Sequence, residues 1–297
     1  MKYVYYPGCS LKSSGKPYEE SLLEVLKKAE LDVEELGGWN CCGATAYMSV
    51  DESDAMALAG RNLALAEKGR PKGKGEVIDM IAPCNACYLV LMKAKKQIEE
   101  SAHLGPAVQD AFSQAGLEYR GKVRIRHPLD VLANDIGMER IKEMCTRSLK
   151  GLKIACYYGC QVVRPYSTFD DQFNPMTMDD MLRAAGAETL DWTSMKARCC
   201  GGTFTGTIPN AGLRLSYIIL KEAKRLGADM IATACPLCQF NLECYQGSME
   251  KRFDDDLNIP SLYFSQILGY AMGIDPKKLS MQNMLVSPDK ALEACGA

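Results

Sequence analysis

The chain has 297 residues, of which 47% are hydrophobic and 24% are charged, as in globular proteins and unlike disordered or collagen-like ones. At this length it can form one large core or two domains of roughly 150 residues each. The formal net charge of -2 provides no general attraction to nucleic acid or to anionic lipid, so we expect neither as a partner.

The cysteine content is the most unusual feature of the composition, because the chain has 14 cysteines. The first residues contain no secretory apolar stretch, and no segment approaches the roughly 18 apolar residues of a membrane span. We therefore expect a cytoplasmic protein without a membrane span. In a reducing compartment so many cysteines indicate metal or redox chemistry rather than disulfides.

Short β-prone runs alternate along the chain with segments whose apolar residues have helical spacing. We predict strands at 2–6, 33–36, 77–82, 123–126, 153–157, 188–191, 230–233 and 261–264. We predict helices at 20–31, 53–68, 178–185 and 211–226. This alternation predicts an α/β fold with parallel sheets and right-handed crossovers.

The second half of the sequence repeats the cysteine pattern of the first. Each half has a β-prone run that ends in Gly-Cys, then a Cys-Cys-Gly, then a Cys-x-x-Cys. The first interval holds 31 residues in one copy and 38 in the other, and the second interval holds 41 and 34. Two copies are too few for a solenoid. We therefore predict an internal duplication with a joint near 148–153, giving domains 1–150 and 151–297.

Each cysteine group follows the C-terminal end of a predicted strand, where open α/β sheets bind their ligands. Neighbouring glycines allow a tight turn and a close approach to a bulky cofactor. A zinc ion takes four ligands in a tetrahedron, and five cysteines per copy, two of them adjacent, exceed that need. Soft thiolates also hold iron–sulfur clusters, whose several irons can accept neighbouring cysteines. The pattern favours iron–sulfur clusters, with zinc binding and disulfide exchange as alternatives.

The repeated pattern Cys…Cys-Cys-Gly…Cys-x-x-Cys resembles the CCG domain of the catalytic subunit of heterodisulfide reductase from methanogenic archaea. The resemblance covers nearly the whole chain and implies two duplicated Rossmann-like CCG domains with the clusters at the C-terminal ends of the strands. It implies that five cysteines of each copy hold one noncubane [4Fe-4S] cluster. The first set is Cys9, Cys41, Cys42, Cys84 and Cys87, and the second set is Cys160, Cys199, Cys200, Cys235 and Cys238.

The resemblance also implies a reaction and partners. In this family the disulfide between coenzyme M and coenzyme B is held between the two clusters and reduced to two thiols, with each cluster taking one sulfur. The family supplies a cubane iron–sulfur subunit and a flavin subunit as electron donors.

This chain has no ferredoxin cysteine run, no dinucleotide-binding glycine motif and no phosphate loop, so electrons must arrive from elsewhere. One alternative is a homologous subunit that acts on another thiol, quinone or organic-acid couple. The other alternative is a non-catalytic zinc-binding interaction module.

Several basic residues near the motifs are candidates for binding the anionic groups that the resemblance implies for the substrate. They are Arg198, Arg164, Lys12 and Lys16, and each could equally be an ordinary solvated side chain. His127 could donate a proton to a leaving thiolate or could be a structural histidine. Four cysteines match no motif position and are expected to be small buried hydrophobic residues: Cys145, Cys156, Cys244 and Cys295.

Overall fold

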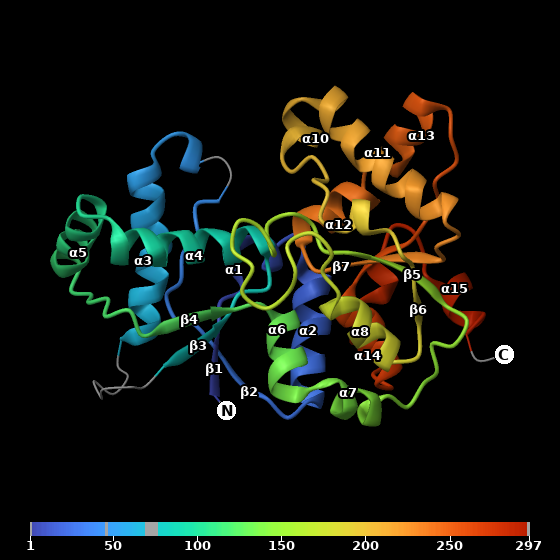
Figure 1. The fold of residues 1–297 in the computed structure, drawn as a ribbon, viewed down its shortest axis with the longest axis horizontal. Helices are drawn as coiled ribbons and strands as arrows, with labels where there is room; N and C mark the ends of the chain where they lie inside the picture. Colours follow the sequence, from blue (N-terminus) through green and yellow to red (C-terminus); the bar gives the residue numbers. More distant parts are fainter. Residues whose placement is uncertain (1, 45–46, 69–76, 296–297) are drawn as a thin grey trace. The chain divides into compact units, whose positions relative to one another are not determined.

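The computed structural model describes residues 2–44, 47–68 and 77–295, and Figure 1 shows its fold. Two four-stranded sheets are present, and every pair of neighbouring strands in them is parallel. The strands of the first sheet are β1 (Lys2–Tyr5), β2 (Asp32–Glu35), β3 (Ile78–Ile81) and β4 (Val123–Arg126). Those of the second are β5 (Lys153–Tyr157), β6 (Glu188–Thr189), β7 (Met230–Thr233) and β8 (Ser261–Tyr263).

The two sheets have the same topology. The strand order is β2-β1-β3-β4 in the first and β6-β5-β7-β8 in the second. This common order confirms the predicted duplicated α/β fold with parallel sheets. All eight strands lie at the predicted positions, and β6 is the one that deviates most, since it ends two residues early.

Four helices correspond to the predicted ones: α2 (Lys16–Lys28), α3 (Glu52–Glu67), α8 (Thr177–Ala184) and α11 (Pro209–Arg225). Helix α2 starts four residues earlier than predicted, with Pro17 in its first turn. Proline suits that position because the N–H groups of the first turn have no partner inside the helix. Helix α3 begins after Asp51, whose carboxylate accepts a hydrogen bond from the backbone N–H of Asp54.

Further helices connect these elements. In the first half they are α1 (Gly8–Leu11), the 3-10 turn η1 (Tyr47–Ser49), α4 (Asn85–Glu100), α5 (Leu104–Gln114), α6 (Pro128–Val131), the π-helical turn η2 (Leu132–Ile136) and α7 (Met138–Met144). In the second half they are α9 (Thr193–Lys196), α10 (Phe204–Thr207), α12 (Pro236–Glu243), α13 (Gln246–Phe253), α14 (Phe264–Ala271), the 3-10 turn η3 (Met281–Asn283) and α15 (Asp289–Glu293). None of the helices that the structure describes is long and apolar enough to cross a membrane.

The chain forms two compact units that do not follow the order of the sequence. One unit contains Met1–Cys9 and Leu31–Pro128, and the other contains Ser10–Glu30 and Leu129–Ala297. The predicted domains 1–150 and 151–297 are the two copies of the sequence repeat. This division of the chain stays a prediction. Packing instead assigns α2 and the segment from Leu129 onward to the second unit.

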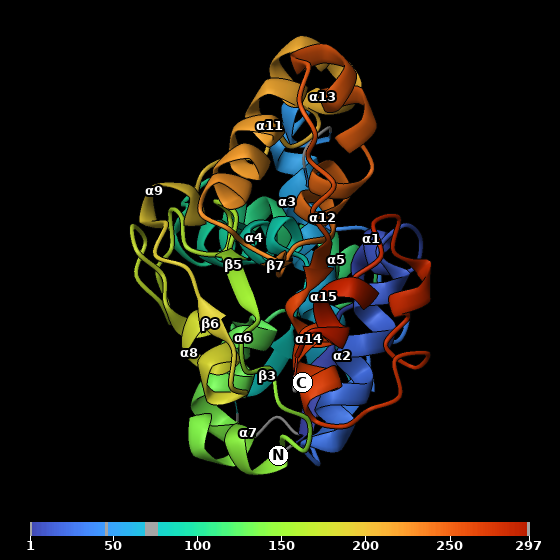
Figure 2. The same ribbon diagram turned by 90° about the vertical axis from the view of Figure 1, so that its right-hand side faces the viewer.

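Aromatic and hydroxyl contacts hold α2 in the second unit, where it lies beside α14 (Figure 2). The Tyr18 ring stacks on Tyr263 with centroids 4.5 Å apart and meets Phe264 edge-on at 6.1 Å. The hydroxyl oxygens of Ser21 and Ser265 are 2.7 Å apart in the same buried contact. These pairs explain why the helix that connects β1 to β2 packs with the C-terminal part of the chain.

Candidate functional site

The cysteines lie at the point in each sheet where the strand order reverses. In the first sheet the chain moves from β1 to one neighbour, β2, and then back to the other neighbour, β3. Open parallel sheets bind ligands at the carboxyl ends of the two strands that flank this switch point. Cys9 follows β1 and Cys84 follows β3, and Cys160 and Cys235 follow β5 and β7 in the same way.

The thiols of the first copy lie close to one another. The Sγ atoms of Cys41 and Cys9 are 3.6 Å apart, and those of Cys42 and Cys87 are 3.3 Å apart. Cys42, Cys84 and Cys87 are buried, whereas Cys9 and Cys41 are exposed. The first site is therefore anchored in the core and open on one side.

The second copy has the same arrangement. The Sγ atoms of Cys200 and Cys238 are 3.6 Å apart, and both residues are buried together with Cys235. Cys199 is exposed and Cys160 is partly exposed, so this site also has an open side. Both predicted sets of five cysteines are thus brought together, each within its own compact unit.

Helix starts and a glycine shape the site. Cys84 and Cys235 directly precede α4 and α12, so each Cys-x-x-Cys lies at a helix N-terminus, whose partial positive charge favours thiolates. Gly8 has a φ of +69°, and a Cβ there would lie 2.9 Å from the Sγ of Cys87. Only glycine fits this turn.

Hydrogen bonds between neighbouring thiols shift the pKa values of the motif cysteines. Hydrogen bonds from Cys42 and Cys9 lower the pKa of Cys41 to about 2, while the neighbouring Cys41 raises the pKa of Cys42 to about 12. In the second copy a hydrogen bond from Cys160 lowers the pKa of Cys199 to about 6. In the first copy the exposed member of the adjacent pair is therefore the better thiolate, the form that binds metals. In the second copy the pKa of the buried Cys200 is lowered as well, mainly by a hydrogen bond with Cys238.

A tyrosine holds the Cys-Cys loop in both copies. The Tyr6 hydroxyl donates to the carbonyl of Asn40 at 2.8 Å, and the Tyr157 hydroxyl donates to the carbonyl of Arg198 at 2.5 Å. Burial and the nearby thiols raise the pKa of both phenols well above the usual value, so they stay protonated donors. Each bond ties the end of a strand to the residue before the adjacent cysteines.

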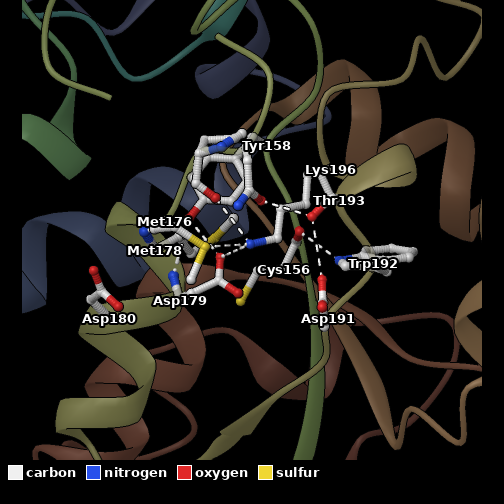
Figure 3. A network of polar contacts seen from close by, with 12 residues as sticks. Cys156, Tyr158, Met176, Met178, Asp179, Asp180, Asp191, Trp192, Thr193 and Lys196 are labelled. Atoms are coloured by element: carbon white, nitrogen blue, oxygen red, sulfur yellow. Dashed lines mark hydrogen bonds and ion pairs between the residues drawn. The ribbon is translucent and has the colours of Figure 1, made fainter. Parts of the chain in front are cut away.

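The second copy has a buried ionic network that includes Lys196, Asp179 and Tyr158 (Figure 3). The Nζ of Lys196 lies 3.1 Å from an Asp179 carboxylate oxygen, and both side chains are at most 2% exposed. Lys196 also donates to the carbonyl of Pro175 at 3.0 Å, and the Tyr158 hydroxyl donates to Asp179 at 2.7 Å. The carbonyl of Lys196 accepts from the backbone N–H groups of Tyr158 and Gly159. The network therefore joins the segment before Cys160 to the segment before Cys199.

Comparison with known families and proteins identifies the repeat. The family CCG, described as a cysteine-rich domain, matches residues 3–92 and again residues 154–243. These two matches cover more than half of the chain and contain all ten predicted ligands. The chain belongs to the CCG family.

Several curated proteins resemble the chain over nearly its full length. A ferredoxin:CoB-CoM heterodisulfide reductase subunit of Methanosarcina mazei is 30% identical over 96% of this chain and 94% of its own length. A protein of Archaeoglobus profundus, named as similar to a heterodisulfide reductase subunit, is 30% identical over 94% and 93%. The 8-methylmenaquinol:fumarate reductase membrane anchor subunit of Wolinella succinogenes is 27% identical over 97% and 98%. These relatives support a role in oxidation and reduction.

A solved structure confirms the fold alone. A hypothetical protein from Helicobacter pylori superposes with a TM-score of 0.73 and 15% identity, over 96% of this chain and 52% of that chain. The CCG chain thus spans about half the length of that protein. At this identity the likeness carries no argument about activity.

The thiol sets fit an iron–sulfur cofactor by their donor chemistry. Each CCG copy offers five soft sulfur donors at a switch point, and Gly8 leaves room for a bulky group in the first copy. Among residues 2–44, 47–68 and 77–295, no group of three or more His, Cys, Asp or Glu side chains is placed to hold one metal ion. The fit to a cofactor with several irons rests on the chemical type and the number of the cysteine sulfurs.

The four basic candidates differ in how far they are already engaged. Lys12 and Lys16 pair with Glu19 and Glu20 at 2.7 Å and 3.5 Å. The Nε of Arg164 donates to the carbonyl of Gln172 at 2.9 Å, and its guanidinium lies 5.7 Å from the Phe173 ring centre. Arg198 is exposed, and its guanidinium bonds to no residue that the structure describes. Arg198 is thus the most available of the four cations, directly before Cys199.

His127 lies inside the first unit. It is fully buried, its Nε2 is 3.1 Å from the carbonyl of Pro83, and its ring meets the Tyr88 ring edge-on at 5.7 Å. Pro83 and Tyr88 flank the Cys84–Cys87 motif, so His127 supports that loop. These contacts favour the structural role, and the proton-donor role stays a prediction.

The four cysteines outside the motifs divide into two kinds. Cys156 is fully buried in β5, where burial and Asp179 raise the pKa of its thiol, as expected for an inert core residue. Cys145 and Cys295 are only partly buried, and Cys244 is exposed. The expectation of burial was therefore wrong for Cys244, because its position directly after α12 faces solvent.

Sequence reasoning missed three groups that act on the sites. Tyr6 and Tyr157 could have been found, since each lies three residues before the first cysteine of its copy. Lys196 gave no signal, because a single lysine normally indicates a solvated surface. Asn241, whose Nδ2 lies 3.4 Å from the Sγ of Cys200, gave none either, since one amide in a short helix is common.

Proposed function

We propose that the chain is the disulfide-reducing subunit of a heterodisulfide reductase and that its ten motif cysteines hold two noncubane [4Fe-4S] clusters. The observation that carries this proposal is the gathering of two complete five-thiol sets, each at the switch point of its own sheet. The 30% identity to named heterodisulfide reductase subunits over more than nine tenths of both chains supports it.

The reaction that we propose consumes two electrons and two protons. The disulfide of coenzyme M and coenzyme B gains both and yields two thiols, with cleavage of the S–S bond. When bound, two clusters supply one-electron transfers whose number matches this need. The chain contributes exposed cysteines at the open side of each site and the unengaged Arg198 guanidinium, which suits an anionic group of the substrate.

The electrons must come from partner subunits. The name of the Methanosarcina mazei relative includes ferredoxin and identifies that protein as one subunit of a larger enzyme. We propose that a subunit with cubane iron–sulfur clusters, supplied in turn by a flavin subunit, delivers electrons to this chain. Co-purification of such subunits with the tagged full-length chain from its native host would support this assignment, whereas isolation of the chain alone with full physiological activity would contradict it.

The experiment that tests the function combines metal analysis with turnover. We expect about eight irons and eight sulfides per chain and reduction of the coenzyme M–coenzyme B disulfide by reduced viologen. A matched sample of Lys221→Met should behave like the parent, because Lys221 forms a half-exposed ion pair with Asp255 and contacts no motif cysteine. One or two zincs without sulfide would instead indicate the interaction module.

A second function is supported by one specific comparison. The relative in Wolinella succinogenes is named for 8-methylmenaquinol and fumarate, and it matches this chain over 97% of its length. A quinone-linked role predicts oxidation of a menaquinol analogue by the iron-loaded chain in its complex and no turnover of the heterodisulfide. Assaying both substrates on one preparation separates the two functions.

A further inference from the structure

The helices α4 and α12, which contain the second cysteine of each Cys-x-x-Cys, differ in one buried side chain. Asn241 lies in α12 three residues after Cys238, on the same side of the helix, and is fully buried. Its Nδ2 is 3.4 Å from the Sγ of Cys200 and 2.8 Å from the carbonyl oxygen of Gly202. A side-chain amide therefore contacts the sulfur of a motif cysteine.

The orientation of this amide is fixed by its partners. The Gly202 carbonyl can only accept a hydrogen bond, so the atom that faces it must be the nitrogen. The Oδ1 on the other side accepts from the Thr205 hydroxyl at 2.7 Å. With one N–H used by Gly202, the second N–H of the same group is left to donate to Cys200.

The first site has no equivalent donor at this position. The residue three places after Cys87 in α4 is Val90, which is also buried and carries no N–H on its side chain. The cysteine that corresponds to Cys200 is Cys42, which faces Cys87 at 3.3 Å. The duplicated sites therefore have the same set of cysteines. They differ in one side chain of the helix that contains the last cysteine, which is polar in α12 and apolar in α4.

We propose that Asn241 raises the reduction potential of the second site above that of the first. The inference rests on the proposed function in one respect, namely that each cysteine set holds a cluster. Reduction adds negative charge, part of which resides on the cysteine sulfurs, and an N–H donor stabilises that charge. The second site is consequently the one that accepts an electron first, so the two halves act in a fixed order.

The test is a redox titration of the full-length, iron-loaded chain, followed by paramagnetic resonance. In the parent we expect two distinct midpoint potentials. Asn241→Leu keeps the side-chain shape and removes the donor, so the higher of the two potentials should shift to a more negative value while the lower one stays unchanged. Unchanged potentials in an Asn241→Leu protein with full iron content would overturn the inference.

Thr205→Val is the matched control, because it removes the hydrogen bond to Oδ1 and leaves the amide N–H groups in place. Both potentials should stay at the parental values, and an equal shift in Thr205→Val would also overturn the inference. If Asn241→Leu alone fails to fold, the double variant Asn241→Leu/Thr205→Val removes both polar partners together, which is better tolerated. It is compared with Thr205→Val and should show the same negative shift. A parental chain without iron would instead refute the proposed function itself, which distinguishes the two failures.

Discussion

The two copies of the motif agree in what holds the sulfur atoms and differ in what surrounds them. Each copy places its cysteines at the switch point of a parallel sheet, begins a helix directly after the first cysteine of its Cys-x-x-Cys, and fixes the Cys-Cys loop with a tyrosine hydroxyl. These shared features all determine sulfur positions. The duplication has therefore kept the arrangement of the cysteine sulfurs.

The differences lie in the polar groups around each site. The second copy has the buried Lys196 network where the first has Gly38, and the amide of Asn241 where the first has Val90. Arg198 precedes the second Cys-Cys pair, and its guanidinium bonds to no residue within 2–44, 47–68 and 77–295. Asn40 precedes the first pair and accepts a hydrogen bond from Arg61 at 2.7 Å. The second site thus has buried polar side chains at two positions where the first copy has Gly38 and Val90. A duplicated protein can in this way keep two similar cysteine sites and give them different surroundings.

The largest expected effect comes from removing one ligand at equivalent positions of the two copies. Cys42→Ser and Cys200→Ser each replace a soft thiolate by a hard hydroxyl, so each should lose the iron of one site, about four of eight irons, and abolish turnover. Iron analysis and the viologen assay measure both effects. Cys156→Ser is the control, because its thiol lies in β5 outside the sites. Full activity in either ligand variant would contradict the assignment for that copy.

The next largest effect concerns stability and affects only the second copy. Lys196→Met leaves the buried carboxylate of Asp179 without its cation, and such a loss costs about 3–5 kcal/mol in the free energy of unfolding. Denaturant unfolding measures it. The double variant Lys196→Met/Asp179→Leu replaces the pair by apolar side chains and should recover most of the loss. If the single variant unfolds like the parent, the ion pair does not support this half.

The same variant has a predictable pH dependence. Burial already raises the pKa of Asp179, and Lys196 opposes that rise. Without the lysine the folded pKa lies further above the unfolded value, so stability is present below the unfolded pKa and is lost as pH rises through the folded pKa. Lys196→Met should therefore differ least from the parent in mildly acidic buffer and most at neutral pH.

A feature of the two copies could be predicted from the sequence when a short stretch of residues indicates it, and could not when it depends on contacts between distant residues. The strands and the ten cysteines could be predicted, because alternation along the chain defines an α/β fold and the motif itself recurs. The packing of α2 in the second unit could not, since its apolar face does not specify which partner it covers. Asn241 and Lys196 were also missed, because their roles depend on contacts with residues 39 and 17 positions away, Gly202 and Asp179.

A moderate effect on substrate use should distinguish the residues that precede the two Cys-Cys pairs. Arg198→Ala removes an exposed guanidinium, and the loss of a charge-assisted hydrogen bond to an anionic group lowers kcat/KM about tenfold. Arg164→Ala, Lys12→Ala and Lys16→Ala should have smaller effects, because these cations already have partners. Asn40→Ala is the matched control in the first copy. Equal losses in Arg198→Ala and Asn40→Ala would show that the cation does not select the substrate.

The smallest effect tests the feature that the copies share. Tyr6→Phe and Tyr157→Phe each remove one hydroxyl that donates to a loop carbonyl, at 2.8 Å and 2.5 Å. A carbonyl that loses its hydrogen bond at such a part-buried position costs at most about 1–3 kcal/mol, so each variant should lose up to that amount of unfolding free energy and keep its iron. Because the two bonds share no partner, the double variant should lose the sum of the two single losses. A loss in one copy with none in the other would mean that the tyrosines are not equivalent. The likeness of the two sites would then be limited to the cysteines, and the loops that carry them would be held by different interactions.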